Sequence, residues 1–248
     1  MFTKFDRLSV GIFLFCVFPV INAQSLNFAD PESAGLSPAG LEKVTQRLQR
    51  HIDDGDISGV VATVIRDGKI VYSEALGQRD IEKSLPMTDD TLFRIYSMTR
   101  EITSVAVLQL YEQGKFKLND PIKMYLPEFE NQQVLLDSDN TDLSQTRART
   151  GDITVAHLLT HTSGLGSRSS ALYTENQVRD KNISLDQMTS NAARIPLFQD
   201  PGTEFRYGIH ATILGKLIEV WSGEELLSYL EKNIFEPLGM NNTMFWAQ

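Results

Sequence analysis

Ser97 and Arg100 stand at a spacing that suits nucleophilic chemistry. Apolar residues between positions 99 and 113 recur with the period of a helix, so we expect Ser97 at the N-terminal mouth of that helix. Unpaired backbone N–H groups at such a mouth can hold a developing negative charge. Residues three apart share a helix face, and Arg100 is therefore expected to point back at Ser97. Considered alone, Ser97 could equally be a simple N-cap serine.

The residue at position 100 decides what chemistry this pair can do. In a Ser-x-x-Lys motif the lysine amine reaches the serine hydroxyl and takes its proton. Arg100 keeps its own proton, so it can orient Ser97 and stabilise negative charge but cannot serve as the general base. Neither Ser-x-x-Lys nor Gly-x-Ser-x-Gly occurs anywhere in the sequence.

His157 and His161 are four residues apart, a spacing that could place two metal ligands on one helix face. No carboxylate lies between them, as it does in the zinc-protease motif, so we expect both histidines to be structural. Ser163 is interpreted as a loop serine, and His51 and His210 carry no functional signal. The sequence predicts no bound metal and no organic cofactor.

The elements around these residues predict an α+β fold. Ser37 and Pro38 are typical of a helix start, and apolar residues continue on one face to Ile52. Two apolar runs then flank Asp67-Gly68, a strong hairpin signal. A helix followed by a hairpin indicates a helix packed on an antiparallel sheet. No convincing partner strands follow, so the sheet is expected to be incomplete.

The remainder of the chain reads as mainly helical. We expect Gly114 to cap the helix that starts near Thr99, and the helical part of the fold to run from about residue 115 onward. Further helices are predicted at 155–159, 213–221 and 224–235. The polar stretch from 130 to 151 is interpreted as a surface insertion.

The first 23 residues resemble a secretory signal peptide. Lys4 and Arg7 precede an apolar run from 8 to 21, and Ala23 supplies a small residue for cleavage. The run is too short to span a bilayer comfortably, although an uncleaved anchor is the alternative. A lipoprotein is disfavoured because bulky Phe15 precedes Cys16. We therefore expect an exported protein, periplasmic or secreted, with no stable membrane span once residues 1–23 are removed.

Composition and charge narrow the class of partner. Hydrophobic residues make up 42% of the 248, enough for a sizeable core. Residues 1–23 contain Lys4, Arg7 and Asp6, so their removal changes the net charge from −9 to −10 and takes away the only cysteine. An acidic chain of this kind is a poor candidate for binding nucleic acid or anionic membranes.

Several segments together resemble the serine β-lactamase and DD-peptidase superfamily, in particular class C β-lactamases and the related carboxylesterases. The segments that carry the resemblance are Phe93-Arg94-Ile95-Tyr96-Ser97-Met98-Thr99-Arg100, Leu118-Asn119-Asp120-Pro121-Ile122, Tyr125-Leu126-Pro127-Glu128-Phe129, His157-Leu158-Leu159-Thr160-His161-Thr162-Ser163-Gly164-Leu165, Pro201-Gly202-Thr203-Glu204-Phe205-Arg206-Tyr207 and Phe235-Glu236-Pro237-Leu238-Gly239-Met240. The resemblance extends from about Gly35 to the C-terminus. It implies a β-lactamase/transpeptidase-like α+β fold, an α/β sandwich plus a helical domain.

The resemblance also assigns roles by position. Ser97 matches the acylated nucleophile, Arg100 stands where the family has its proton-accepting lysine, and Tyr207 matches the tyrosine that assists proton transfer. A buried aromatic residue is the alternative interpretation of Tyr207. Ile209 stands where classical β-lactamases carry an asparagine that holds the substrate amide, which favours an ester over a β-lactam. Family members continue past residues 236–239 with further strands and a third motif.

These observations predict a signal peptide at 1–23 and a partial serine hydrolase domain at 24–248. We expect an esterase that acts on a small-molecule ester or amide through an acylated serine, with activity impaired by Arg100. Two alternatives remain: a non-catalytic binding or regulatory homologue, in which Arg100 would hold a carboxylate, and a truncated inactive copy.

Overall fold

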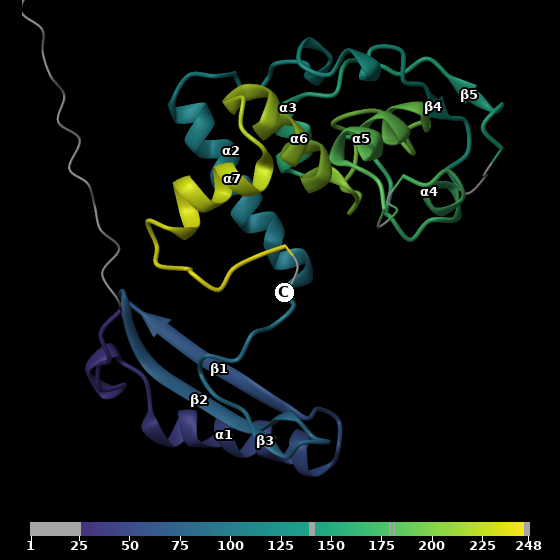
Figure 1. Cartoon of the computed structure of the whole chain (residues 1–248). Coiled ribbons are helices and arrows are strands. Elements are labelled where there is room, and N and C mark those ends of the chain that lie inside the picture. Colours follow the sequence, from purple (N-terminus) through teal and green to yellow (C-terminus); the bar gives the residue numbers. More distant parts are fainter. Residues whose placement is uncertain (1–25, 139–141, 179, 181, 246–248) are drawn as a thin grey trace, which may run out of the picture.

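The structure is a computed structural model that describes residues 26–138, 142–178, 180 and 182–245. The predicted signal peptide at 1–23 lies outside the described residues. Figure 1 shows two parts joined by an extended segment. We call the first part, residues 38–86, the sheet layer, and the second part, residues 96–235, the helical body.

The sheet layer begins with helix α1 (Pro38–Asp53), which follows the short 3-10 helix η1 (Glu32–Ala34). The expected cap is present: the Ser37 hydroxyl accepts a hydrogen bond from the Gly40 backbone N–H, and Pro38 opens the helix. On the sheet side, the hydroxyls of Thr45 and Tyr72 lie 3.0 Å apart and link α1 to the second strand.

The sheet has three antiparallel strands in the order β1 (Gly59–Arg66), β2 (Lys69–Asp80) and β3 (Leu85–Pro86). The turn between β1 and β2 is made by Asp67 and Gly68, both with positive φ, as the hairpin signal predicts. The expectation of only two strands was wrong. A two-residue strand such as β3 is too short for alternating hydrophobicity to reveal it.

The helical body starts earlier in the chain than predicted. It comprises 3-10 helix η2 (Tyr96–Met98), α2 (Thr99–Glu112), η3 (Ile122–Met124), η4 (Pro127–Phe129), α3 (Val155–Leu159), α4 (Ala171–Glu175), α5 (Leu185–Arg194), α6 (His210–Ser222), α7 (Leu226–Leu230) and the π-helix η5 (Glu231–Phe235). Helix α2 belongs here because its fully buried residues Ala106, Val107 and Leu110 join the same core as Leu217 of α6. Gly114, with a φ of 72°, follows the end of α2.

Residues 130–151 are not a surface insertion throughout. Strands β4 (Val134–Leu135) and β5 (Thr146–Arg147) pair within this segment, and both residues of β4 are buried. The Gln132 side chain donates to the carbonyl oxygens of Ala192 and Ile195. The polar composition of the segment concealed three buried residues, Gln132, Val134 and Leu135, of which the last two belong to the hydrophobic core.

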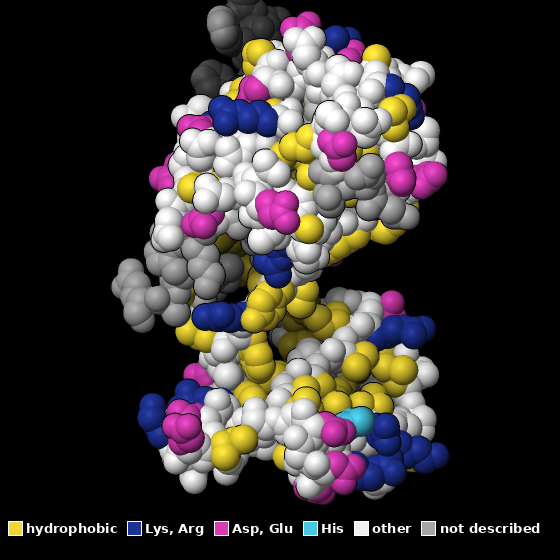
Figure 2. All heavy atoms as spheres, turned by 90° about the vertical axis from the view of Figure 1, so that its right-hand side faces the viewer, with side chains coloured by type: hydrophobic (Ala, Val, Ile, Leu, Met, Phe, Trp, Pro, Cys, Tyr) yellow, Lys and Arg dark blue, Asp and Glu magenta, His cyan; other side chains and the backbone are white. Residues whose placement is uncertain are grey.

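The two parts bury their hydrophobic residues unequally. The single buried core cluster runs from Ala106 to Phe235 and lies wholly within the helical body. In the sheet layer only Val71 and Tyr72 of β2 are buried. Figure 2 shows hydrophobic side chains gathered where the two parts approach one another. Together the elements make an α+β fold whose packed centre is helical.

Candidate active site

Ser97 lies in η2, immediately before α2, as the helix pattern predicts. The residue before it, Tyr96, has a φ of 43°, in the left-handed region that costs a non-glycine residue about 1–2 kcal/mol. Strain of this kind collects at functional sites because the surrounding structure must hold it there. The bend presents Ser97 on the surface, where a substrate can reach it.

The backbone N–H of Ser97 has no acceptor among the described residues and could donate to an anion. The N–H groups of Met98 and Thr99 are used within the turn, by the carbonyls of Ile95 and of Tyr96 and Ser97 respectively. Among the described residues, no acceptor is recorded for the Ser97 backbone N–H. A free N–H at the start of a helix is suited to binding an oxyanion.

Arg100 makes its hydrogen bonds to the segment that carries Tyr207. Its Nε donates to the phenol oxygen of Tyr207 at 2.8 Å, and its Nη1 donates to the carbonyl oxygen of Gly208 at 2.8 Å. The guanidinium carbon lies 4.3 Å from the centre of the Tyr207 ring. These contacts fix the guanidinium beside the phenol of Tyr207.

Tyr207 is held by the backbone on both sides. The Arg206 N–H donates to the carbonyl of His161, and the Ile209 N–H donates to that of Gly166. Gly208 is required between them, since a Cβ there would lie 2.4 Å from the Gly166 oxygen. The segment at 206–209 thus lies along the loop at 161–166, and the phenol projects from this pair toward α2.

The phenol oxygen of Tyr207 is surrounded by donors. The pKa of Tyr207 is lowered from the ordinary value of a phenol, above all by the nearby Ser97 side chain. Desolvation has the next largest effect and raises the pKa, the charge and hydrogen bond of Arg100 lower it further, and Glu101 raises it slightly. A hydrogen bond lowers a phenol pKa when the oxygen accepts it, because the donor stabilises the phenolate. The structure therefore brings Ser97, Arg100 and Tyr207 together at one oxygen atom.

The two histidines of the 157–161 segment have different surroundings. The Nδ1 of His157 accepts from the Thr154 backbone N–H, and the Thr154 hydroxyl accepts in return, which caps α3. His161 instead stacks its ring on that of Tyr207, with centroids 5.2 Å apart, and its Nδ1 lies 3.0 Å from Nδ1 of His210.

Sequence reasoning missed His161 and His210 as neighbours of the site. Their contact joins residues 49 positions apart, which no local spacing encodes. Ser163, in the same loop, is buried and accepts from the Leu165 N–H, in line with its expected loop role.

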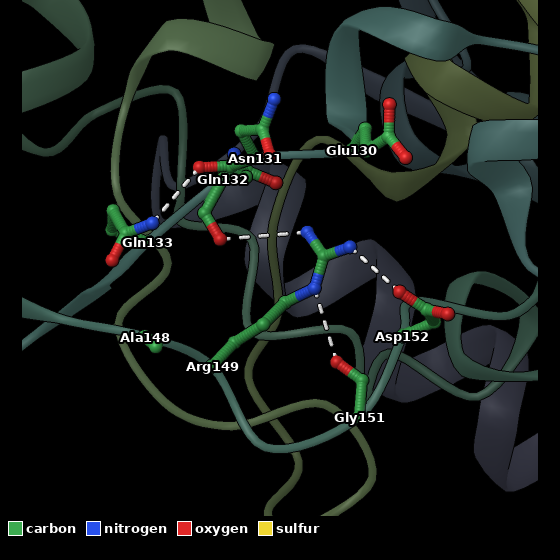
Figure 3. Close-up of a pocket in the computed structure, with 8 residues that line it drawn as sticks. All are labelled: Glu130, Asn131, Gln132, Gln133, Ala148, Arg149, Gly151 and Asp152. Carbon is green, nitrogen blue, oxygen red and sulfur yellow. Dashed lines mark hydrogen bonds and ion pairs between the residues drawn. The ribbon is translucent and has the colours of Figure 1, made fainter.

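A second hollow lies elsewhere on the helical body, between residues 130–133 and 148–152 (Figure 3). Its only cation is Arg149, which donates to the carboxylate of Asp152 and to the carbonyl oxygens of Gly151 and Phe129. Those bonds occupy the guanidinium, so Arg149 has a structural role and ties residues 149–152 to the chain near Phe129.

Within the described ranges, no group of three or more His, Cys, Asp or Glu side chains is placed to hold a metal ion. No helix of the described chain is long and apolar enough to cross a membrane.

Comparison with known proteins places the chain in a family. The model of the Beta-lactamase family matches residues 44–248. Esterase EstB of Burkholderia gladioli is 31% identical over 87% of this chain and 54% of its own length. The ML-236A carboxylate methylbutanoyltransferase mlcH of Penicillium citrinum is 33% identical over 76% of this chain and 47% of its own length.

The same relationship is visible in three dimensions. The structure of EstCE1, described as a hydrolase with promiscuous acyltransferase activity, superposes with a TM-score of 0.71 and 30% identity over 80% of this chain and 51% of its own. The chain spans about half the length of the curated relatives it matches. It belongs to the Beta-lactamase family and has the β-lactamase/transpeptidase-like α+β fold of the serine hydrolases and acyltransferases in that family.

Proposed function

We propose that this protein is a serine esterase in which Ser97 is acylated and Tyr207 moves the proton. One observation carries the proposal: the phenol oxygen of Tyr207 accepts from Arg100 and lies close enough to the Ser97 side chain for that side chain to lower the phenol pKa. A base must be within hydrogen-bonding reach of the proton it removes, and Tyr207 meets that condition. Arg100 cannot accept a proton, so its contribution is to stabilise the phenolate.

In the acylation step, the Tyr207 phenolate takes the proton of the Ser97 hydroxyl as Oγ attacks the ester carbonyl carbon. The carbonyl oxygen becomes an anion, and the Ser97 backbone N–H, for which the described residues supply no acceptor, would donate to it. The C–O bond to the alcohol then breaks, and the leaving alkoxide takes the proton back from Tyr207. The products are a free alcohol and acyl-Ser97.

In the deacylation step, Tyr207 takes a proton from water as the water oxygen attacks the acyl carbon. The bond to Ser97 Oγ breaks, the proton returns to Oγ, and the carboxylic acid leaves. An alcohol in place of water would receive the acyl group instead. The mlcH relative is named as a methylbutanoyltransferase, which is consistent with such a transfer.

The substrate we propose is a small-molecule ester. Ile209 is buried, with 3% of its surface exposed, and it is apolar where an amide-binding asparagine is found in classical β-lactamases. Position 209 therefore offers no hydrogen bond to the amide of a β-lactam or peptide. An ester lacks the N–H that such a residue would recognise, and the EstB relative is named as an esterase.

Hydrolysis of p-nitrophenyl butyrate tests this proposal. Ser97→Ala and Tyr207→Phe are expected to lower kcat/KM by about 10³-fold or more, because each removes a member of one catalytic set. Tyr111→Phe is the matched control, since Tyr111 is exposed to a similar degree but lies away from the site on α2. Equal rates for wild type and Ser97→Ala would refute the proposal.

Arg100→Lys tests the further proposal that arginine limits the activity. Lysine can lose its proton and share the work of the base, so we expect kcat to rise. If Arg100→Lys lowers kcat instead, the Tyr207 phenolate needs the guanidinium, which donates both to the phenol oxygen and to the Gly208 carbonyl. Arginine at position 100 would then not impair the activity.

A non-catalytic role as a carboxylate-binding protein is the second candidate. Its basis is the permanent charge of Arg100 beside Ser97. The hydrogen bonds from Arg100 to Tyr207 and Gly208 favour the esterase, because they use the guanidinium inside the protein.

We also propose that residues 1–23 direct export and that the mature chain begins at Gln24. The basis is the basic, apolar and small-residue pattern of that segment. The intact mass of protein recovered from the periplasm or medium tests this, and a mass that includes residues 1–23 would contradict it.

A further inference from the structure

We propose that His161 is a positioning residue for Tyr207, with its neutral ring stacked on the phenol and fixed in place by the buried ring of His210. This inference rests on the proposed function of Tyr207 as the proton-transferring group. His161 and Tyr207 have nearly parallel rings, 22° apart in orientation. Tyr207 is 46% exposed, so few neighbours restrict its side chain. The stacked ring of His161 would hold the phenol oxygen at one position beside Ser97 and Arg100.

The backbone of His161 has a left-handed conformation that is unfavourable for a residue with a side chain. His161 follows the end of α3 with a φ of 57°, a position at which helices usually place glycine or asparagine. A histidine there is strained by about 1–2 kcal/mol. A strained residue in contact with a reactive group is a reason to look for function.

The hydrogen bonds assign the protons of the pair. Nδ1 of His161 and Nδ1 of His210 are 3.0 Å apart, so only one of them can carry a hydrogen. The Gly208 carbonyl, which can only accept, raises the pKa of His210 and so favours a hydrogen on its ring, while Nε2 of His210 is buried without a partner among the described residues. Nδ1 of His210 is therefore the donor, and Nδ1 of His161 accepts from it.

Burial, together with the charges around the pair, lowers the pKa of both rings and so favours their neutral forms. Desolvation, and then the Arg100 cation, lower the pKa of His161, which Glu101 on α2 partly offsets. Burial lowers the pKa of His210 to about 3, with smaller lowering effects of His161 and Arg100. The Tyr207 phenol and the apolar ring of Phe205, 5.7 Å away, face His161 from the other side.

A proton added to His161 would oppose this arrangement. It would place an N–H against the N–H of His210 and a cation beside Arg100. The His161 ring would then lose the hydrogen bond that holds it to His210. Without a fixed ring to stack on, the Tyr207 phenol would move away from Ser97 and Arg100. The site is therefore expected to disassemble only at a pH below the ordinary imidazole pKa of 6.5, because the pKa of His161 is lowered from that value.

Two substitutions separate the stack from the hydrogen bond. His161→Phe keeps an aromatic ring and removes the acceptor, whereas His161→Asn removes the ring and keeps an acceptor near the place of Nδ1. Asparagine also tolerates the left-handed backbone, so His161→Asn is the variant most certain to fold. His157→Gln is the matched control: glutamine is a normal capping-box residue, and His157 has no contact with Tyr207.

The primary measurement is the pKa of Tyr207, from ultraviolet titration of each variant minus the same variant carrying Tyr207→Phe. His161→Asn is expected to raise the Tyr207 pKa by about one and to slow fluorophosphonate modification of Ser97 by about 10-fold. His161→Phe and His157→Gln should each stay within about 3-fold of wild type near neutral pH, and His161→Phe alone should lose the decline on acidification.

The outcomes distinguish this inference from the proposed function. A Tyr207 pKa and labelling rate in folded His161→Asn that equal those of wild type would overturn the role of His161. Equal losses in His161→Asn and in folded His161→Phe would overturn the stack as its means. Because the titration needs no turnover, a wild type that never reacts at Ser97 refutes the esterase while leaving the His161 result to be decided by the pKa.

Discussion

The sheet layer and the helical body differ in how they are held together and in what they contribute to the site. The helical body has one continuous buried core, and it contains Arg100, Tyr207 and His161, with Ser97 at its entrance. The sheet layer buries two hydrophobic side chains and provides none of these groups. The geometry of the candidate site is therefore a property of helix packing, above all of α2 against α6.

This difference has a physical basis in the sequence. Helix α6 is apolar on several sides, and seven of its residues are buried. Strand β1 has no buried residue. Because burial of apolar surface is the main driving force of folding, the two regions should respond very differently to matched substitutions.

The largest expected difference concerns two leucines. Leu217 of α6 is completely buried, whereas Leu76 of β2 is only partly covered. Leu217→Ala should lower the free energy of unfolding by about 2–5 kcal/mol, because it leaves a cavity in a closed core. Leu76→Ala should cost below about 1.5 kcal/mol, because the space is open to solvent. Urea denaturation measures both, and equal losses would mean that the sheet layer is packed as tightly as the helical body.

A smaller effect tests where the sheet layer is tight. Gly55 and Gly77 share a φ of 77°, but a Cβ at Gly77 would lie 2.5 Å from the Ser58 oxygen, while one at Gly55 meets nothing within 4 Å. Gly55→Ala should cost about 1 kcal/mol from backbone strain alone. Gly77→Ala should cost about 3 kcal/mol, because a clash is added. If the two substitutions lower the free energy of unfolding equally, the backbone near Gly77 must shift enough to remove the clash with the Ser58 oxygen.

The smallest effect is the pH dependence of the helical body. The folded pKa of His210 is about 3, below its ordinary 6.5, so the unfolded chain takes up a proton that the folded chain refuses. Stability is therefore complete above pH 6.5 and falls with decreasing pH toward 3. The expected slope is at most about 1.4 kcal/mol per pH unit.

Urea denaturation between about pH 7.5 and about pH 5.5 measures this slope before most carboxylates titrate. His210→Leu is the control, since it removes the titrating ring and should flatten the slope even if it lowers stability throughout. An unchanged slope in His210→Leu would assign the pH dependence to other groups.

Local features of the fold were predictable from the sequence, and long-range ones were not. The cap at Ser37 and the turn at Asp67 and Gly68 depend on neighbouring residues, and both were found as predicted. The hydrogen bond from Arg100 to the Gly208 carbonyl was not predicted, because its acceptor is 108 residues away. The i, i+3 rule describes an isolated helix and cannot take account of that acceptor.

The site shows the same division. The segments around Ser97 and Tyr207 suggested the pair through family resemblance, and the fold brings the two residues together. His161 was interpreted as structural because its spacing to His157 suggested a metal pair, and no carboxylate lies between the two as in the zinc-protease motif. The contacts that place it at the site come from the distant 206–209 segment, through the stack on Tyr207 and the hydrogen bond from the Arg206 N–H to the His161 carbonyl.

The most direct test of the central claim is the intact mass of the protein after reaction with a fluorophosphonate, followed by peptide mapping. We expect one adduct per chain, located on Ser97, formed at a rate that rises as Tyr207 loses its proton. Tyr207→Phe should slow the reaction, and Ser97→Ala should abolish it. No adduct in the wild type, or an adduct that persists in Ser97→Ala, would contradict the claim that Ser97 is the nucleophile activated by Tyr207.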